Sequence, residues 1–490
     1  MDQNELAEVV ELARACNSDM SDVEIKAAAG GLPKSVRETI SAFSNGHGGT
    51  LILGLDETAG FRPAPGFDPK RIQESLAAVC ADEMEPPVRA VVQIMGFEGG
   101  TLVVTDVPEL DPRFKPCYVR ARGEYGGSFI RGGDGDRRLT DFEIHLLHTN
   151  RGQPRDDLAP VPGATVDDLD SSELAFLLRR VRQRQPRSFA GLDDLTALRR
   201  LNILDGAEPV VPTLAGMLIF GRYPQHWFPQ LNVTLVVYPG VNSGDIPPGA
   251  PRFLDNRAFD GPIPYIVEDA LAGVVRNMAI RGYVEGVGRR DVYDYPVEAL
   301  REALVNALVH RDYSPYSHGS PVQITMYADR VTIANPGGLY GAVTEDDLGR
   351  EGVTSSRNPA LIKILQDARL PDSDRTVCEN RGSGIPAMVR ELRQIHALPP
   401  EFRSRISRFT VTLRKAPDMP ATGERRGYTA GDIVLAAIPP GRSVSRQEIQ
   451  DASGLSQVTV VRQLNRLIEA GLVAATASPR SPHRRYRLAP

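Results

Sequence analysis

A carboxylate and a carboxamide stand four residues apart in the apolar segment 302–313, as Glu302 and Asn306. A spacing of four places both side chains on one face of a helix, because an α-helix repeats about every 3.6 residues. A glutamate can activate a water molecule, and the amide oxygen of an asparagine is a hard ligand for Mg²⁺. The pair is therefore a candidate for metal-assisted nucleotide chemistry, although the same spacing also occurs on solvated helix faces.

Two glycine turns follow this segment. Residues 322–327 and 329–334 alternate in polarity, which predicts two strands joined by a short turn. The second strand ends in Asn335-Pro-Gly-Gly338, where the backbone can approach a flat ligand closely. Gly382-Ser-Gly384 then precedes a predicted helix over 387–398, and free N–H groups at such a helix start suit phosphate oxygens.

The order of these features resembles the GHKL ATPase superfamily, which includes gyrase and the histidine kinases, over residues 290–415. It is most similar to a divergent branch found in bacterial transcriptional regulators often labelled RecG-related. The resemblance implies that Glu302 activates water, that Asn306 binds Mg²⁺, and that ATP is the cofactor. It places ATP against Asn335, Gly337, Gly338, Arg381, Gly382, Ser383 and Gly384. Asn335 stands where an aspartate usually reads adenine, so ATP binding is expected while slow ATPase activity stays open.

The overall composition is that of a soluble globular protein. A chain of 490 residues, with 41% hydrophobic and 24% charged residues, is long enough for about three or four domains. It has no run of 18 apolar residues and begins with an acidic segment, so we expect neither a membrane span nor a secretory signal. Its four cysteines form no Cys-x-x-Cys pair, which argues against a zinc knuckle or a disulfide framework. We expect a cytoplasmic α+β multidomain protein.

The last seventy residues differ from the rest in charge. Residues 421–490 contain ten arginines, no lysine and five acids, a local charge of +5 in a chain of net charge −5. Ser445 and Glu448 have the spacing of a capping box, and a helix is predicted over 457–470 with Val460, Leu464 and Leu467 facing inward. Two strands with a basic tip between them follow. This local basicity indicates a polyanionic partner.

The C-terminal pattern resembles a bacterial winged helix-turn-helix over residues 425–490. In that fold the third helix enters the major groove and the wing contacts the backbone of duplex DNA. The resemblance implies DNA contacts from Ser456, Gln457, Thr459, Arg462, Gln463 and Arg466 on the helix and from Arg484 and Arg485 at the wing. A winged helix that binds protein is the alternative.

The N-terminal residues predict a second α+β module. We expect a helix over 5–16, a strand over 23–26, a helix over 36–44, a buried strand over 50–56, and a strand, turn and capped helix over 128–144. Four segments, at 23–26, 42–49, 53–56 and 129–131, resemble the Schlafen AlbA-like domain. The resemblance covers residues 1–150 and implies a DNA-binding role.

Some members of that family cleave RNA with an acidic triplet, which would correspond to Asp19, Glu24 and Asp56 here. Three acids could hold a divalent cation for phosphodiester hydrolysis. The favoured interpretation is structural, with Glu24 paired to Lys26 or to an arginine. The module carries 24 acids against 15 basic residues. This net negative charge disfavours a general DNA-binding surface, whose affinity depends on displacing counterions from the phosphates. The alternative is a local basic patch formed by Lys26, Lys34, Arg37, Arg120, Arg122, Arg131, Arg137 and Arg138.

Residues 151–289 are expected to form a linker and a connecting α/β region. Residues 154–163 are rich in proline and charge, which predicts the linker itself. Helices are predicted over 167–185, capped by Asp170 or Ser171, and over 262–278, with a strand over 231–238.

Two functional hypotheses follow. The leading one is a transcriptional regulator, a homodimer or higher homo-oligomer by family analogy, in which Mg-ATP orders a lid over residues 340–380 and changes how the winged helices bind operator DNA. The competing one is an ATP-controlled, metal-dependent nuclease or defence effector that acts through the Schlafen-like acids.

Overall fold

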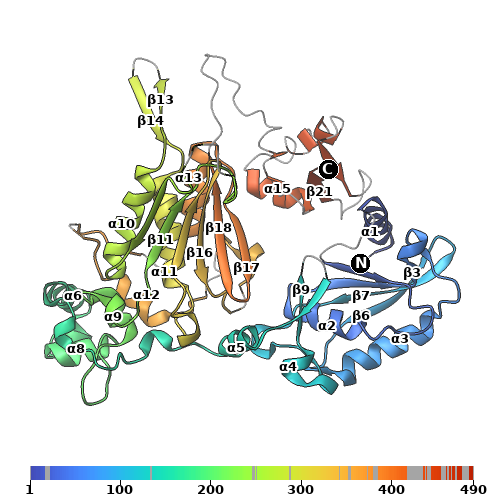
Figure 1. Cartoon of the computed structure of the whole chain (residues 1–490), viewed down its shortest axis with the longest axis horizontal. Coiled ribbons are helices and arrows are strands. Elements are labelled where there is room, and N and C mark those ends of the chain that lie inside the picture. Colours follow the sequence, from blue (N-terminus) through green and yellow to red (C-terminus); the bar gives the residue numbers. More distant parts are fainter. Residues whose placement is uncertain are drawn as a thin grey trace. The chain divides into compact units, whose positions relative to one another are not determined.

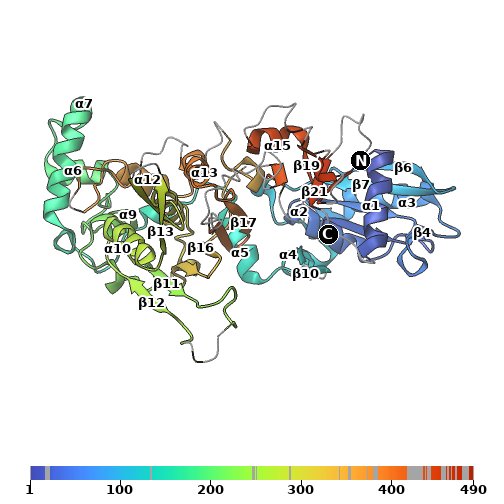
Figure 2. The ribbon, with the colours of Figure 1, turned by 90° about the horizontal axis from the view of Figure 1, so that it is seen from above.

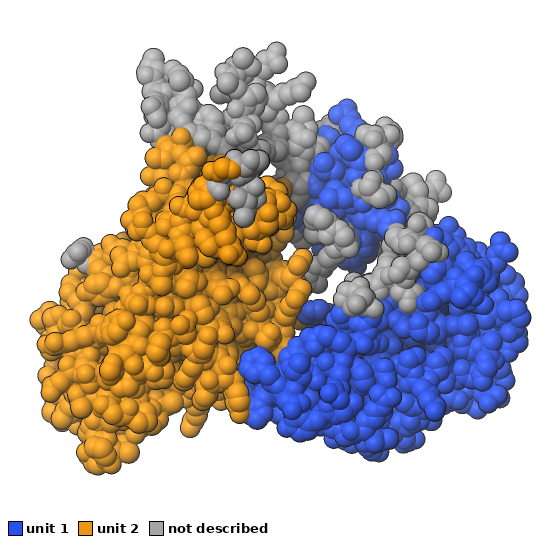
Figure 3. Space-filling view, in the orientation of Figure 1, with its two compact units in different colours: residues 1–151, 420–490 blue, residues 152–419 orange. Residues whose placement is uncertain are grey.

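The computed structural model is an α+β protein that divides into two compact units, residues 1–151 with 420–490, and residues 152–419 (Figures 1 and 3). This confirms the expected α+β multidomain class. No helix among the described residues is long and apolar enough to cross a membrane. The structure describes residues 2–16, 22–132, 135–245, 249, 251–285, 288–341, 343–350, 355–371, 373–378, 384–415, 434–435, 437–438, 443–453, 460, 463–464, 466–468, 472–476 and 485–488.

The N-terminal part is a four-stranded sheet between helices. The sheet has the order β1-β2-β7-β6, formed by Val23–Lys26 (β1), Gly49–Leu53 (β2), Gly100–Val107 (β7) and Val91–Phe97 (β6). Only the β1–β2 pairing is parallel. Leu51 and Leu53 pack with helices α2 (Val36–Asn45) and α3 (Pro69–Ala78), whereas Ile52 packs with α1 (Gln3–Cys16). The helices therefore cover opposite faces of the sheet.

The strand predicted over 50–56 is interrupted at Gly54. Gly54 has a φ of +111°, and a Cβ there would lie 2.9 Å from the Phe67 ring. The chain therefore leaves β2 and forms β3 (Leu55–Asp56), which pairs with β4 (Arg62–Pro63).

A hairpin and a capped helix complete this part, as predicted for residues 128–144. The hairpin consists of β9 (Phe129–Gly132) and β10 (Gly135–Arg138). Helix α5 (Asp141–Thr149) begins with a capping box between Thr140 and Glu143. The remaining short elements are α4 (Gly123–Gly127) and the paired strands β5 (Met84–Glu85) and β8 (Tyr118–Val119).

A six-stranded sheet forms the centre of residues 152–419. Its order is β12-β11-β15-β16-β18-β17, formed by Asp255–Phe259 (β12), Val233–Val237 (β11), Val322–Met326 (β15), Arg330–Pro336 (β16), Arg408–Arg414 (β18) and Glu401–Arg405 (β17). Strand β11 runs parallel to β15, and the other neighbours are antiparallel. Strands β11 and β12 lie side by side in Figure 2 and precede residue 290, so a boundary at 290 cuts through one sheet.

Three helices pack with one face of this sheet, namely α10 (Ile263–Arg276), α11 (Val297–Val309) and α13 (Gly384–Gln394). They share one buried cluster with Val331 and Ile333 of β16 and with the short helix α12 (Pro359–Leu365). The two strands predicted over 322–334 are confirmed as β15 and β16. A further hairpin, β13 (Ile280–Glu285) with β14 (Gly288–Tyr293), was not expected.

The connecting region belongs to the same core. Helix α6 (Ser171–Arg184) begins at the predicted cap, Asp170, and α9 (Leu214–Phe220) is buried along its whole length. Helices α7 (Pro186–Phe189) and α8 (Asp194–Arg200) lie between them in the chain. Residues 154–163 are packed rather than free, because Asp157 is buried and its Oδ2 accepts hydrogen bonds from the backbone N–H groups of Ala360 and Leu361.

The C-terminal residues form a small sheet with one capped helix. The sheet has the order β19-β21-β20, formed by Val444–Ser445 (β19), Arg485–Leu488 (β21) and Val473–Ala475 (β20). Helix α15 (Arg446–Ser453) begins with the predicted capping box, in which the Glu448 N–H donates to Ser445 Oγ at 3.2 Å and the Ser445 N–H donates to the Glu448 carboxylate. The inward positions predicted for the next helix, Val460, Leu464 and Leu467, are buried.

Candidate functional site

Helix α11 holds Glu302 and Asn306 on its half-exposed side. The apolar residues of the helix are buried against the sheet and against α10 and α13, which leaves this polar side at the edge of the core. Asn306 Nδ2 donates a hydrogen bond to Glu302 Oε1 at 3.1 Å, so the two side chains share one helix face as predicted. Because the amide nitrogen is directed at the carboxylate, the amide oxygen of Asn306 is the atom that could bind a metal ion.

The start of α13 lies against the Glu302 carboxylate. A Cβ on Gly384, the first residue of α13, would lie 1.8 Å from Glu302 Oε1, so only glycine allows this approach. The guanidinium of Arg301 lies 3.9 Å from Glu302 Oε2. The predicted phosphate-side turn therefore meets the predicted base at Gly384. Its other members, Arg381, Gly382 and Ser383, lie outside the described residues.

The first glycine turn is fixed by backbone contacts. Asn335 is buried in β16 opposite Phe409, and its Nδ2 donates to the Pro336 carbonyl. Gly337 has a φ of +86°, and a Cβ on Gly338 would lie 2.2 Å from the Arg405 carbonyl oxygen. The need for glycine at both positions is thus explained by packing, whether or not a ligand approaches them.

The turn between β17 and β18 is bonded directly to this glycine turn. The Gly337 N–H donates to the Ser407 carbonyl at 2.9 Å, and the Gly338 N–H donates to the Ile406 carbonyl at 3.1 Å. The backbone of the candidate adenine side and the tip of the β17–β18 hairpin therefore cannot move independently.

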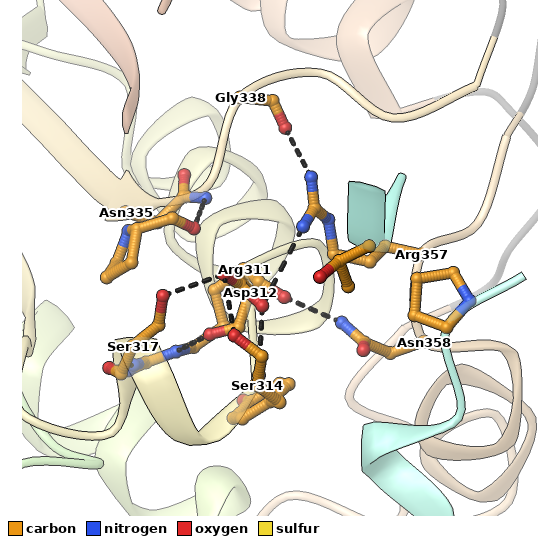
Figure 4. Close-up of polar contacts among 12 residues, drawn as sticks. Arg311, Asp312, Ser314, Ser317, Asn335, Gly338, Arg357 and Asn358 are labelled. Atoms are coloured by element: carbon orange, nitrogen blue, oxygen red, sulfur yellow. Dashed lines mark hydrogen bonds and ion pairs between the residues drawn. The ribbon is translucent and has the colours of Figure 1, made fainter. Parts of the chain in front are cut away.

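A buried polar cluster that the sequence did not predict supports the glycine turn and the end of α11 (Figure 4). The Asp312 carboxylate accepts hydrogen bonds from the Ser314 backbone N–H and from the hydroxyls of Ser314 and Ser317. Arg357 Nη1 lies 3.8 Å from Asp312 Oδ1, and its Nη2 donates to the Gly338 carbonyl at 3.0 Å. The side chain of Arg357 is only 2% exposed, so this ion pair is buried.

Asn358 joins the cluster to the end of α11. Its Nδ2 donates to the carbonyls of Val309 and Arg311 at 2.9 and 2.8 Å. The cluster thus ties the C-terminal end of α11, the glycine turn and the start of α12 together. Its only signal in the sequence is the charged run His310-Arg-Asp312 after an apolar helix, and the distant partners Arg357 and Asn358 could not be read from it.

Burial shifts the titration of this cluster. The pKa of His310 is lowered to about 4, because burial disfavours the imidazolium and the Arg357 charge adds to that effect. Burial also lowers the pKa of the Arg311 and Arg357 guanidinium groups, against the opposing effect of Asp312. His310 is therefore neutral at neutral pH.

The N-terminal acids are engaged in a different way. Glu24 is buried, with Oε1 2.9 Å from Lys26 Nζ and Oε2 2.7 Å from Arg131 Nη1, which confirms the structural interpretation of this residue. The half-exposed Asp56 caps a turn by accepting from the Thr58 N–H and hydroxyl, which lowers the pKa of Asp56. Asp19 lies outside the described residues. Within the described part of the chain, no group of three or more potential ligands is arranged for a metal ion.

Most of the basic patch considered for this module is neutralised. Six of its eight members lie within ion-pair distance of a carboxylate of the same module, namely Lys26, Arg37, Arg120, Arg122, Arg131 and Arg137. Their charge is therefore largely compensated before any polyanion approaches.

One of the predicted DNA contacts is wrong. Gln463 is only 8% exposed, because it lies three residues after Val460 and four before Leu467 and so shares their inward face. Arg466 is exposed, as expected. Arg485 is half-exposed and is paired with Glu448 at 3.0 Å, so its charge is compensated. Ser456, Gln457, Thr459, Arg462 and Arg484 lie outside the described residues.

Three family models match parts of the chain. One described as "Putative ATP-dependent DNA helicase recG C-terminal" matches residues 319–413, and one described as "Schlafen, AlbA_2" matches residues 19–140. A third, described as a domain of unknown function, matches residues 146–234. The chain thus contains a Schlafen AlbA_2 domain and a RecG C-terminal-like domain, which confirms these two parts of the resemblance.

Two solved structures resemble parts or all of the chain. The N-terminal domain of a "Putative ATP-dependent DNA Helicase RecG-related Protein" from Nitrosomonas europaea is 35% identical, with 29% of this chain and 95% of that chain covered and a TM-score of 0.23. The DIP2311 protein from Corynebacterium diphtheriae is 16% identical, with 99% and 96% of the two chains covered and a TM-score of 0.42. No curated protein matches the chain.

Proposed function

We propose that this chain, which contains a Schlafen AlbA_2 domain and a RecG C-terminal-like domain, is a transcriptional regulator that binds ATP and DNA. In this proposal Mg-ATP occupies the region around α11 and α13, and its occupancy changes how the C-terminal residues bind operator DNA. The observation that carries the proposal is the Glu302–Asn306 pair on α11, set against the glycine that begins α13.

The residues present fit Mg-ATP. The Glu302 carboxylate and the Asn306 amide lie side by side at the edge of the core, and the amide oxygen, which is directed away from the carboxylate, is a hard ligand of the kind that Mg²⁺ prefers. The start of α13, held close by Gly384, offers the partial positive charge of a helix N-terminus to an anion. In this site Asn306 would hold the metal ion, and Glu302 would accept a proton from water.

The C-terminal residues support the DNA-binding half of the proposal. The capped helix α15, the buried apolar residues Val460, Leu464 and Leu467 and the three-stranded sheet agree with the pattern of a winged helix-turn-helix. The net charge of +5 over residues 421–490 suits the phosphate backbone, and Arg466 is exposed.

A melting experiment tests nucleotide binding. ATP with Mg²⁺ at a hundredfold excess over its Kd should stabilise the fold by about 2.7 kcal/mol. Asn306→Ala should weaken this effect because the metal ion loses a ligand, whereas Asn256→Ala, at an exposed position of β12, should not change it. The proposal fails if neither millimolar ATP nor a non-hydrolysable analogue raises the melting temperature of the wild type.

A further inference from the structure

One face of the six-stranded sheet is polar and rich in arginine. Residues alternate along each strand, and those next to Val331, Ile333 and Leu413 in the sequence point away from the helices. Five arginines lie on this second face, which we call the arginine face: Arg330, Arg403, Arg405, Arg408 and Arg414. The remaining positions near them are mainly threonines, Thr325, Thr332, Thr410 and Thr412, which are half-exposed.

Two pairs of arginines stand directly opposite each other across the strands. Arg330 is opposite Arg414, and Arg405 is opposite Arg408. Like charges in directly opposed positions destabilise a sheet. The stability of the sheet therefore does not explain why arginines occupy these positions.

The first pair is compensated by acids. Arg330 Nη1 lies 2.8 Å from the Asp329 carboxylate, and Arg414 Nε lies 2.6 Å from Glu401 Oε1. The guanidinium of Arg330 also lies 4.2 Å from the centroid of the Tyr327 ring. This end of the face is therefore neutralised within the fold.

The second pair is not compensated. Arg403, Arg405 and Arg408 are exposed, and none of the three forms an ion pair within the described part of the chain. Arg408 Nη2 donates only to the neutral Gln323 amide. Three positive charges thus lie together at one corner of the sheet, in a chain whose net charge is −5.

Protection of a sheet edge does not explain this corner. Any charged residue blocks edge-to-edge association, and mixed charges do so without repulsion. The opposite edge strand, β12, has that arrangement, with Arg257 Nε 2.9 Å from Asp255 Oδ1. On β17 and β18, by contrast, the three arginines without an ion pair all carry positive charge, which suits phosphates, and the nearest acid bonded to β17 is Glu345, whose carboxylate accepts from the Ser404 backbone N–H.

Aromatic rings lie elsewhere on the same side of the sheet. The Tyr238 and Tyr327 rings are stacked with centroids 5.3 Å apart, and Phe253 meets Tyr238 edge-on at 5.4 Å. Both tyrosines are half-exposed. Proteins bind single-stranded nucleic acid with aromatic rings, on which the unpaired bases stack, and with a row of basic side chains that contact the phosphates.

We propose that the arginine face binds single-stranded nucleic acid. Phosphates contact Arg403, Arg405 and Arg408, the threonine hydroxyls line the path across β18, β16 and β15, and bases meet the aromatic rings beyond them. This site is separate from the C-terminal residues and does not depend on bound nucleotide, so it goes beyond the function proposed above.

The test uses the full chain without ATP and a labelled oligothymidylate, with binding followed by fluorescence anisotropy between about 50 and 200 mM salt. Counterion release gives a slope of about −0.7 per phosphate contact for single strands, so the double variant Arg403→Ala, Arg405→Ala should reduce the slope by about 1.4. Its affinity should fall tenfold or more. The matched control is Arg179→Ala, Arg187→Ala, which removes two exposed arginines from α6 and α7 of the same unit and should change the affinity less than twofold.

Four results would overturn the proposal: no binding by the wild type, an unchanged slope and affinity in the double variant, an equal loss in the control, or a loss seen on duplex DNA and not on the single strand. Both variants should have the melting temperature of the wild type, because all four arginines are exposed.

Discussion

The two carboxylate oxygens of Glu302 have different neighbours. Oε1 accepts the Asn306 amide at 3.1 Å, whereas Oε2 has Arg301 at 3.9 Å. Glu302→Gln keeps the shape and removes the base, so any slow ATP hydrolysis should fall by about 10² or more while the ATP-induced rise in melting temperature remains. Glu298→Gln, one turn earlier on α11, is the control. Phosphate release that is unchanged in Glu302→Gln would place the base elsewhere.

His310, which caps the end of α11 beside the buried cluster, provides a pH prediction. Its pKa is about 4 in the folded chain against an ordinary value of 6.5, so the unfolded chain binds more protons between these values. Stability should therefore fall as the pH falls through this window, by about 2 kcal/mol between pH 7 and pH 5. His310→Gln cannot titrate, and its unfolding free energy should be flatter over the same range. Equal acid sensitivity in both proteins would contradict this assignment.

Residue contacts within one helix could be predicted from the sequence, and contacts between distant segments could not. The helix repeat was sufficient to pair Glu302 with Asn306. The partners Asp312 and Arg357 are separated by a hairpin and a long loop, so only the folded chain brings them together. Gln463 was predicted to contact DNA but is buried. Its inward position could have been read from the sequence, because the helix repeat that places Val460 and Leu467 inward also places Gln463 there.

The approach of α13 to α11 depends on Gly384. Replacing glycine by alanine in a helix ordinarily adds up to about 1 kcal/mol of stability. Here the added Cβ would lie 1.8 Å from Glu302 Oε1, so Gly384→Ala must push the helix start or the carboxylate away. We expect it to abolish most of the ATP-induced melting shift. Gly319→Ala, where a Cβ meets nothing within 4 Å, should leave that shift intact, and a full shift in Gly384→Ala would show that the site is elsewhere.

Elements with strong periodicity or caps were predictable, and their grouping was not. Helix α6 and the strands β15 and β16 lie where the pattern placed them, whereas α11 spans Val297–Val309 rather than 302–313 and α13 begins at Gly384 rather than at 387. The sheet joins β11 to β15 in parallel across about ninety residues, and such long-range pairing leaves no local signal. Residues 154–163 also depend on a contact that the local sequence does not show. Their proline content predicts a linker, but the buried Asp157 anchors them to the start of α12.

Charge is distributed unevenly over the whole molecule. In the Schlafen AlbA_2 domain, basic residues are largely paired with acids, whereas unpaired arginines occur on the arginine face. The C-terminal residues add a charge of +5. Two separate regions are thus suited to polyanions, and they can be tested separately.

Removal of residues 421–490 separates the two halves of the proposed function. The unit 152–419 has its own buried cluster, which contains α10, α11, α13 and the six-stranded sheet, so its stabilisation by ATP should survive the truncation. Sequence-specific binding to duplex DNA should be lost, because the exposed Arg466 and the other arginines of this segment are removed. Full-length Asn306→Ala is the reciprocal control, since it should lose the response to ATP while keeping the DNA binding seen without nucleotide. Footprinting on the DNA upstream of the gene checks both proteins. A footprint that survives the truncation would move operator recognition to the Schlafen AlbA_2 domain, whose neutralised arginines make it the weaker candidate.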